Sequence, residues 1–238
     1  MFMNRDSMTF YIIEPLFTDK WWSVNEFVDT TRKPVYAKNR PPFCPVCNSQ
    51  LSRYLIKPLE FNFVTAKPFF CDIVFNNEFI FVSENFKKAY ERSGLCGIRE
   101  FREISISKIS THDGVRKAKL PLPPRYFLTD VIVDGAIDLE QSNAVIECPR
   151  YCEYCLNPIE PFDDEKSLGL VKWDGFIIDR RRWHGNNIFK PIGLECFYAV
   201  DGEFREWFES TQLKTGCEFM PESENTDDWI MRKYEGKQ

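Results

Sequence analysis

The sequence is poor in histidine and lacks the common catalytic motifs. Only two of its 238 residues are histidine, His112 and His184, and imidazole is the usual general base in proteins. It also lacks a glycine-rich phosphate loop, a Gly-x-Ser-x-Gly turn and a His-Glu-x-x-His motif. These absences argue against a hydrolase or a nuclease, and we expect a protein that is not an enzyme.

Long apolar stretches are missing as well. No run approaches the ~18 apolar residues of a membrane-spanning helix. The segment 1–17 contains Arg5 and Asp6 and does not have the apolar core of a signal peptide. The nine cysteines are an odd number, which does not suit the disulfide framework of a secreted protein. The sequence therefore predicts a cytoplasmic protein with reduced thiols and no membrane partner.

Basic residues are fewer than acidic ones. The chain has 31 Lys and Arg against 36 Asp and Glu, which gives a net charge of −5. Non-specific binding to nucleic acid requires a cationic surface, so the balance favours a basic protein as partner instead. Hydrophobic residues make up 43% of the chain and include 22 Phe. Such a composition predicts a well-packed core and excludes a disordered chain.

Two segments 118 residues apart share one pattern. In the first, an apolar strand at 79–82 leads to Ser83, whose hydroxyl can cap a following helix. In the second, a strand at 197–200 leads to Asp201 in the same role. The helix faces also correspond, with Phe86, Ala89 and Tyr90 matching Phe204, Trp207 and Phe208. A Cys-x-x-Cys pair lies upstream of each segment. We therefore expect an α+β fold of two pseudo-repeated knuckle–strand–helix–strand units with mainly antiparallel sheets.

The expected domain organisation follows from this repeat. The N-terminal unit, with the first cysteine pair, would take up residues 1–115, and the C-terminal unit, with the second pair, residues 144–238. Residues 116–143 would form a bridging strand and a stiff linker that contains Pro121, Pro123 and Pro124. We expect one compact domain overall.

The two Cys-x-x-Cys pairs carry the main chemical signal. They are Cys44 with Cys47, and Cys152 with Cys155. Two intervening residues let a tight turn direct both sulfurs at one ion, and zinc prefers four soft ligands in a tetrahedron. If the halves pack about a pseudo-twofold axis, the two turns meet and the ion staples the halves together. The sequence thus predicts a structural Zn²⁺ held by these four cysteines, with Cys148 as a substitute ligand.

Two other interpretations of the cysteines remain open. The pairs can be reduced and metal-free, or Cys44 and Cys47 can form a redox pair. A redox pair needs a helix start that lowers a thiol pKa, whereas Pro42 and Pro45 favour a loop. Cys71 and Cys196 lie in apolar strands and are expected to fill the core.

The basic run Arg180–Arg182, followed by Trp183, also has two interpretations. It can bind phosphate and stack a base on the indole ring, as in a zinc-containing nucleic-acid-associated protein. It can instead be a solvated turn in which Trp183 anchors a loop, as charge runs more often are. We favour the second interpretation.

Three features of the chain follow the pattern of a known family. They are the pairs Cys44-Pro-Val-Cys47 and Cys152-Glu-Tyr-Cys155, the segment Trp183-His-Gly-Asn-Asn-Ile-Phe189, and the strand–helix unit that ends in Leu213-Lys-Thr-Gly-Cys-Glu-Phe219. With these the chain resembles the double-CXXCG motif proteins, a bacterial family that includes immunity proteins of polymorphic or contact-dependent toxin systems. The segment Trp183–Phe189 looks like that family's Trp-x-Gly-x-Asp-φ-Phe segment, with Asn187 in place of the Asp.

The resemblance implies a function and marks one departure. A member of this kind would be a non-catalytic immunity protein with structural zinc, which binds its cognate protein toxin and occludes the toxin's active surface. The glycine that follows each pair in the family is replaced by Asn48 and Leu156. Asn readily adopts a left-handed turn, whereas Leu does so only at a cost.

Overall fold

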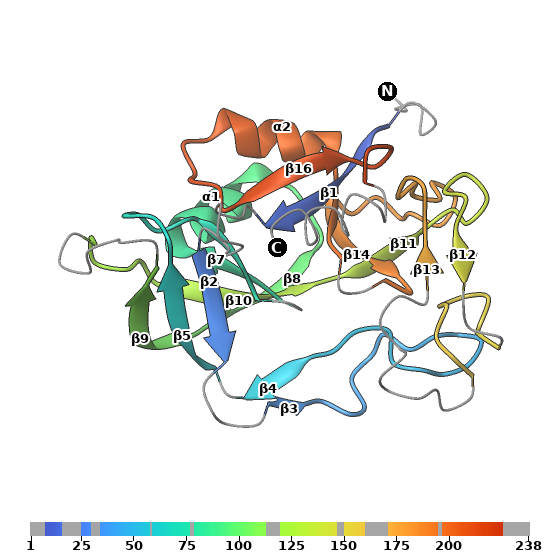
Figure 1. The fold of residues 1–238 in the computed structure, drawn as a ribbon, viewed down its shortest axis with the longest axis horizontal. Helices are drawn as coiled ribbons and strands as arrows, with labels where there is room; N and C mark the ends of the chain where they lie inside the picture. The colour runs from blue at the N-terminus through green and yellow to red at the C-terminus, as the bar shows by residue number, and fades with distance from the viewer. Residues whose placement is uncertain are drawn as a thin grey trace.

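Strands dominate the described part of the chain (Figure 1). The computed structural model describes residues 8–15, 25–29, 34–57, 59–76, 79–112, 120–146, 150–159, 171–194 and 197–225. Within these ranges the fold is α+β, with two large sheets and two helices. The predictions for Cys148, Cys196 and the ends of the chain lie outside the described residues.

The larger sheet has seven strands in the order β8-β10-β7-β6-β2-β5-β9. Its strands are β2 (Asn25–Asp29), β5 (Glu60–Thr65), β6 (Ile73–Asn76), β7 (Phe79–Ser83), β8 (Ile98–Glu103), β9 (Ser105–Thr111) and β10 (Tyr126–Val131). The pairs β2–β6 and β5–β9 are parallel and the others antiparallel. Aromatic rings fill one face, where the Phe27 ring lies 4.6 Å from Phe81 and 5.1 Å from Tyr126.

The second sheet has five strands in the order β11-β14-β15-β1-β16. Its strands are β1 (Phe10–Pro15), β11 (Val133–Ala136), β14 (Ile188–Ile192), β15 (Ala199–Asp201) and β16 (Cys217–Pro221). Only the β11–β14 pair is parallel in this sheet. Two small antiparallel pairs complete the described strands, β3 (Val35–Tyr36) with β4 (Leu55–Lys57) and β12 (Val145–Ile146) with β13 (Val171–Lys172).

Both predicted helices are present and both predicted caps are confirmed. Helix α1 (Glu84–Ser93) follows β7, and Ser83 Oγ accepts a hydrogen bond from Phe86 N at 3.2 Å. Helix α2 (Gly202–Ser210) follows β15, and Asp201 Oδ1 accepts from Phe204 N at 2.9 Å. These side chains satisfy backbone N–H groups that a helix start leaves unpaired. Neither helix has the length and apolar character to span a membrane.

The two helices pack against each other over a shared core. The ring of Phe86 in α1 lies 5.6 Å from Trp207 and 6.5 Å from Phe204 in α2. Apolar residues of both sheets, such as Val82 and Val200, are buried beneath them. The helix faces predicted from sequence therefore form one interface between the two sheets.

The strands beside the two helices pair in corresponding order, β8-β10-β7-β6 and β16-β1-β15-β14. Every pair in these two series is antiparallel. The register corresponds as well. Phe127 in β10 faces Val82 and Glu103, whereas Tyr11 in β1 faces Val200 and Pro221. Strand β1 thus takes the place in the five-stranded sheet that β10 takes in the seven-stranded sheet.

The two central strands differ in where their partners lie in the sequence. β1 lies near the start of the chain but pairs with β15 and β16 near its end. β10 pairs with β7 and β8 and is followed at once by β11, which belongs to the five-stranded sheet. The five-stranded sheet thus combines β1 with strands from the second half of the chain.

Two matching contacts join the loops of the two sheets. Asp72 N donates to Lys214 O at 2.7 Å, and Asn187 N donates to Cys96 O at 3.0 Å. In both places a side chain accepts a second hydrogen bond from the same loop. Lys214 N donates to Asp72 Oδ2 at 2.7 Å, and Cys96 N donates to Asn187 Oδ1 at 2.9 Å. The loop after each helix is thereby fixed to the residue before a strand of the other sheet.

Candidate metal centre

The first cysteine pair lies in a tight turn closed by a bridge between Phe43 and Gln50. Cys44 N donates to Ser49 O at 2.8 Å, and Asn48 N donates to Cys44 O at 2.9 Å. The backbone N–H groups of Val46 and Cys47 point at Cys44 Sγ, at 3.4 and 3.5 Å. Such N–H groups stabilise a thiolate, so the turn suits a metal ligand.

The second pair lies in a turn with the same backbone bonds. Cys152 N donates to Asn157 O at 2.9 Å, Leu156 N donates to Cys152 O at 2.7 Å, and Tyr151 bridges Pro158. Leu156 adopts the left-handed φ of 59° that Asn48 also has. Its side chain is buried in the neighbouring core, and burial of a Leu side chain is worth about 2 kcal/mol. This gain offsets the cost of about 1 kcal/mol for a left-handed leucine.

The two turns meet, and the four predicted cysteines come together. Cys44 Sγ lies 3.7 Å from Cys152 Sγ, and Cys47 Sγ lies 3.5 Å from Cys155 Sγ. All four sulfurs lie within 4.8 Å of one another and could hold a metal ion. A tetrahedron with Zn–S bonds of about 2.3 Å would place its sulfurs about 3.8 Å apart. The sulfur positions therefore fit a four-thiolate site.

The four thiols differ in their surroundings. Cys44, Cys152 and Cys155 are buried, whereas Cys47 is exposed. Burial raises the pKa of Cys155, while the contact of Cys47 Sγ with Ser49 Oγ at 3.2 Å lowers the pKa of Cys47 to about 6. A bound cation would favour the thiolate form of all four, because ligation requires deprotonated sulfur.

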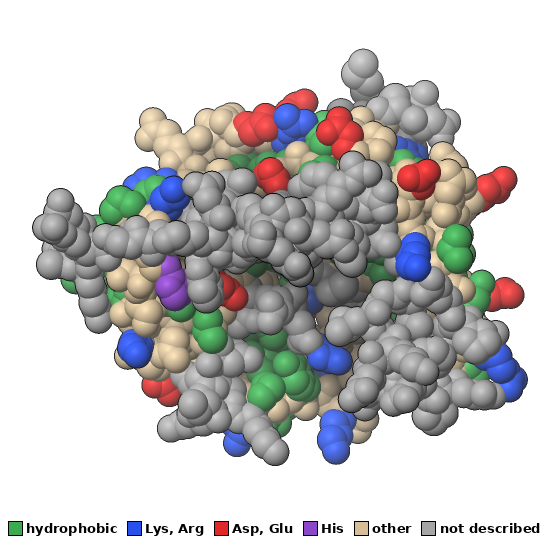
Figure 2. All heavy atoms as spheres, viewed as in Figure 1, with side chains coloured by type: hydrophobic (Ala, Val, Ile, Leu, Met, Phe, Trp, Pro, Cys, Tyr) green, Lys and Arg blue, Asp and Glu red, His purple; other side chains and the backbone are tan. Residues whose placement is uncertain are grey.

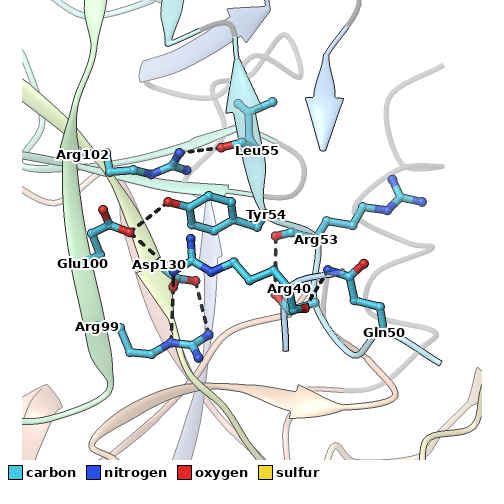
Figure 3. Close-up of polar contacts among 10 residues, drawn as sticks. Arg40, Gln50, Arg53, Tyr54, Leu55, Arg99, Glu100, Arg102 and Asp130 are labelled. Carbon is cyan, nitrogen blue, oxygen red and sulfur yellow. Dashed lines mark hydrogen bonds and ion pairs between the residues drawn. The ribbon is translucent and has the colours of Figure 1, made fainter. Parts of the chain in front are cut away.

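A polar network fastens the first turn to the seven-stranded sheet (Figure 3). Asp130 in β10 is 7% exposed and accepts from Arg40 at 3.0 Å and from Arg99 at 3.3 Å. The Tyr54 ring lies 3.3 Å from the Arg40 guanidinium carbon and 4.0 Å from that of Arg102. Because Arg40 and Tyr54 flank the turn on either side, the network holds both of its ends.

We expect Asp130→Asn to destabilise the protein by about 1–3 kcal/mol, because the two guanidinium groups lose a buried ionic acceptor. Glu100→Gln is the matched control. Glu100 also contacts Arg40, at 3.5 Å, but its side chain is 43% exposed, so the expected loss is under about 1 kcal/mol. Urea unfolding of both variants would measure the difference. Equal losses would contradict a special role for the buried carboxylate.

The second turn is fixed to the end of β14 and to the basic run. Gly193 approaches so closely that an added Cβ would lie 2.7 Å from Cys155 O. Arg182 donates to Tyr154 O at 2.9 Å and lies over the Tyr154 ring at 4.4 Å. These contacts place the second turn beside the five-stranded sheet.

The other members of the basic run are engaged in the same region. Arg180 forms an ion pair with buried Glu222, and Arg181 pairs with Asp179 at 2.9 Å. Trp183 is 7% exposed and packs edge-on against Phe10 at 5.2 Å. The interpretation of Trp183 as a loop anchor is therefore confirmed, and its ring is not available for stacking on a base.

Some residues of this region gave no signal in the sequence. Arg40, Tyr54 and Asp130 belong to no motif, and only the position of the first two beside the Cys44 turn hints at their role. His184 is held by its Nδ1, 2.7 Å from Asp134, which is buried. Cys71 is buried in the core, as predicted.

Comparison with models of known protein families and with curated proteins gave no match to this chain.

Proposed function

We propose that this chain is a non-catalytic binding protein in which a structural zinc ion joins the two cysteine turns. The proposal is carried by the approach of four sulfurs from turns 108 residues apart to within 4.8 Å. Four thiolates complete a zinc tetrahedron and leave no position for a substrate, so the ion would contribute to folding and not to a reaction. Thiolate ligands also favour zinc over the hard cations Mg²⁺ and Ca²⁺.

We further infer that the chain arose by internal duplication. Three sets of correspondences support this inference: the strand registers at an offset of 118, the matching contacts of Asp72 and Asn187, and the equal hydrogen bonds of the two cysteine turns. In a duplicated chain, β1 and β10 would be the first strands of the two units, exchanged between their sheets. The ion would then lie where the two units meet.

The binding activity that we propose is that of an immunity protein, which blocks a cognate bacterial toxin in the cytoplasm of the producing cell. The resemblance to the double-CXXCG motif proteins supports it, as does the net charge of −5, which suits a basic partner. Inhibition would come from shape and charge complementarity that occludes the toxin's active surface.

Co-expression with a toxin-like protein encoded by a neighbouring gene would test the proposal. We expect the chain to restore growth and to form a 1:1 complex with an inactivated form of the toxin, measured by calorimetry. Cys96→Ser, outside the metal centre, is expected to protect as the wild type does. If the wild-type chain neither rescued growth nor bound the toxin, the immunity function would have to be abandoned.

A further inference from the structure

The helix-and-strand segments that take corresponding places in the two sheets carry opposite charges. Residues 79–107, with α1 and β8, have four carboxylates and five Lys or Arg. Residues 197–225, with α2 and β16, have seven carboxylates and two Lys or Arg, an excess equal to the net charge of the whole chain. Figure 2 shows acidic side chains gathered along the edge where α2 lies. This edge would attract a basic partner.

A groove of about 370 Å³ runs between the end of α2 and β16. Its lining includes the apolar side chains of Phe208, Leu213 and Phe219 and the carboxylates of Glu209 and Glu218. Glu209 also pairs with Arg205 of the same helix at 2.7 Å. The volume suffices for one or two side chains of a partner. The groove therefore combines an apolar site with acidic flanks.

One difference between the two helices lies beside the groove. In the first segment, Tyr90 reaches from α1 to the strand, where its hydroxyl accepts from Ile98 N at 3.2 Å. The corresponding residue of α2 is Phe208, which has no hydroxyl. The N–H at the start of β16, that of Cys217, is instead satisfied locally by Thr215 Oγ1 at 2.9 Å. Phe208 therefore makes no hydrogen bond of this kind between α2 and β16.

The outer edge of β16 faces no other described strand. Among the described strands, β16 pairs with β1 alone. Ile13 N donates to Tyr198 O, on the side of β1 away from β16, so the Ile13–Phe219 pair is of the non-hydrogen-bonded kind. The backbone N–H and C=O of Phe219 therefore point toward the open edge, beside the groove.

We propose that the groove between α2 and β16 binds an extended segment of a basic partner protein, which adds a strand beside β16. The proposal rests on the proposed binding function and names the surface that carries it. The added strand bonds to the backbone of Phe219 and places an apolar side chain against Phe208. Lys or Arg side chains of the segment face Glu209 and Glu218.

A labelled ten-residue peptide of alternating Lys and Val is the probe, with fluorescence anisotropy on the full chain as the readout. We expect saturable binding, at least about tenfold tighter than that of a Glu and Val peptide. Phe208→Tyr, which introduces the hydroxyl that α1 carries, and Glu209→Lys are each expected to weaken binding about tenfold, or about 1.4 kcal/mol. The matched controls Tyr90→Phe and Glu91→Lys alter corresponding positions of α1 and should leave the affinity unchanged.

Three outcomes would overturn the proposal. Equal losses from the α1 and α2 variants would mean unspecific charge attraction. Binding that appears only after deletion of residues 226–238 would make the chain's own C-terminal segment the occupant. If the Phe208→Tyr and Glu209→Lys variants bound the toxin with full affinity, the toxin would bind elsewhere and the immunity function would still stand. If the wild-type chain bound no toxin, the immunity function would fail, but the peptide site would not.

Discussion

Removal of the proposed zinc ion from the purified protein is expected to lower its unfolding temperature by at least about 10 °C. Structural zinc contributes an apparent ~10–16 kcal/mol in small zinc domains, and each kcal/mol shifts the midpoint of a chain of this size by about 2–4 °C. Even if only about 4 kcal/mol of this is realised, the shift would be large. The reason is geometric, because the four sulfurs come from two turns that belong to different regions of the fold.

Metal analysis and calorimetric scans would measure this effect. We expect one zinc per chain as purified, and its loss in Cys155→Ser, which removes a buried ligand. Cys96→Ser is the control, because Cys96 is a free cysteine outside the cluster and its replacement should leave the zinc in place. Stability should also fall as the pH is lowered, since a zinc-bound folded state would hold the thiols deprotonated and protons would compete with the ion.

Two results would contradict a structural zinc site. A protein that is purified without metal and unfolds at the same temperature with and without added zinc would have empty thiols. A Cys155→Ser variant that keeps its metal would show that the ion is bound elsewhere. Either result would favour the interpretation of the cysteine pairs as reduced and metal-free.

The features that the sequence predicts correctly have local causes. Ser83 and Asp201 each stand between an apolar strand and a helix with one apolar face, so the two caps are readable from a few neighbouring residues. The meeting of the cysteine pairs is a longer-range prediction. That prediction is drawn from the four ligands that zinc requires, of which each turn supplies only two.

The features that escape sequence analysis depend on partners far along the chain. The alternation in β1 predicts a strand, but not that Tyr11 faces Val200 and Pro221, because any strand with a suitable apolar face satisfies the same pattern. Leu156 has a poor local preference for φ of 59°, which only its burial in the core offsets. Asp130 is one acidic residue among many until the fold brings Arg40 and Arg99 to it.

Asn187→Asp is expected to be strongly destabilising, although Asp occupies the corresponding place in the seven-stranded sheet. There, Asp72 accepts a hydrogen bond from Ser83. In the five-stranded sheet, Asn187 Nδ2 donates to Asp201 Oδ2 at 2.9 Å. Asn187 and Asp201 are 7% and 1% exposed, so the substitution would place two buried carboxylates in contact. The expected loss is about 3–5 kcal/mol at neutral pH.

The pH dependence of this loss has a definite sign. Burial already raises the pKa of Asp201, and a second carboxylate would raise it further, because the pair would share one proton. The folded variant would then hold a proton that the unfolded chain releases above about pH 4. Its deficit in unfolding free energy should therefore be small near pH 4 and grow as the pH rises through the raised pKa.

Replacing the partner as well should restore most of the stability. Asp201→Ser alone removes the buried acceptor of Asn187 Nδ2 and leaves the exposed Glu203, whose Oε2 accepts from the same atom at 3.2 Å. This loss is expected to cost about 1–2 kcal/mol. Asn187→Asp combined with Asp201→Ser reproduces the Asp72–Ser83 arrangement, in which Ser still caps the helix. Urea unfolding should place the double variant within about 1 kcal/mol of wild type, so that the two substitutions couple by several kcal/mol. Additive losses would mean that the correspondence between the two sheets does not extend to their interactions, and would remove a main support for duplication.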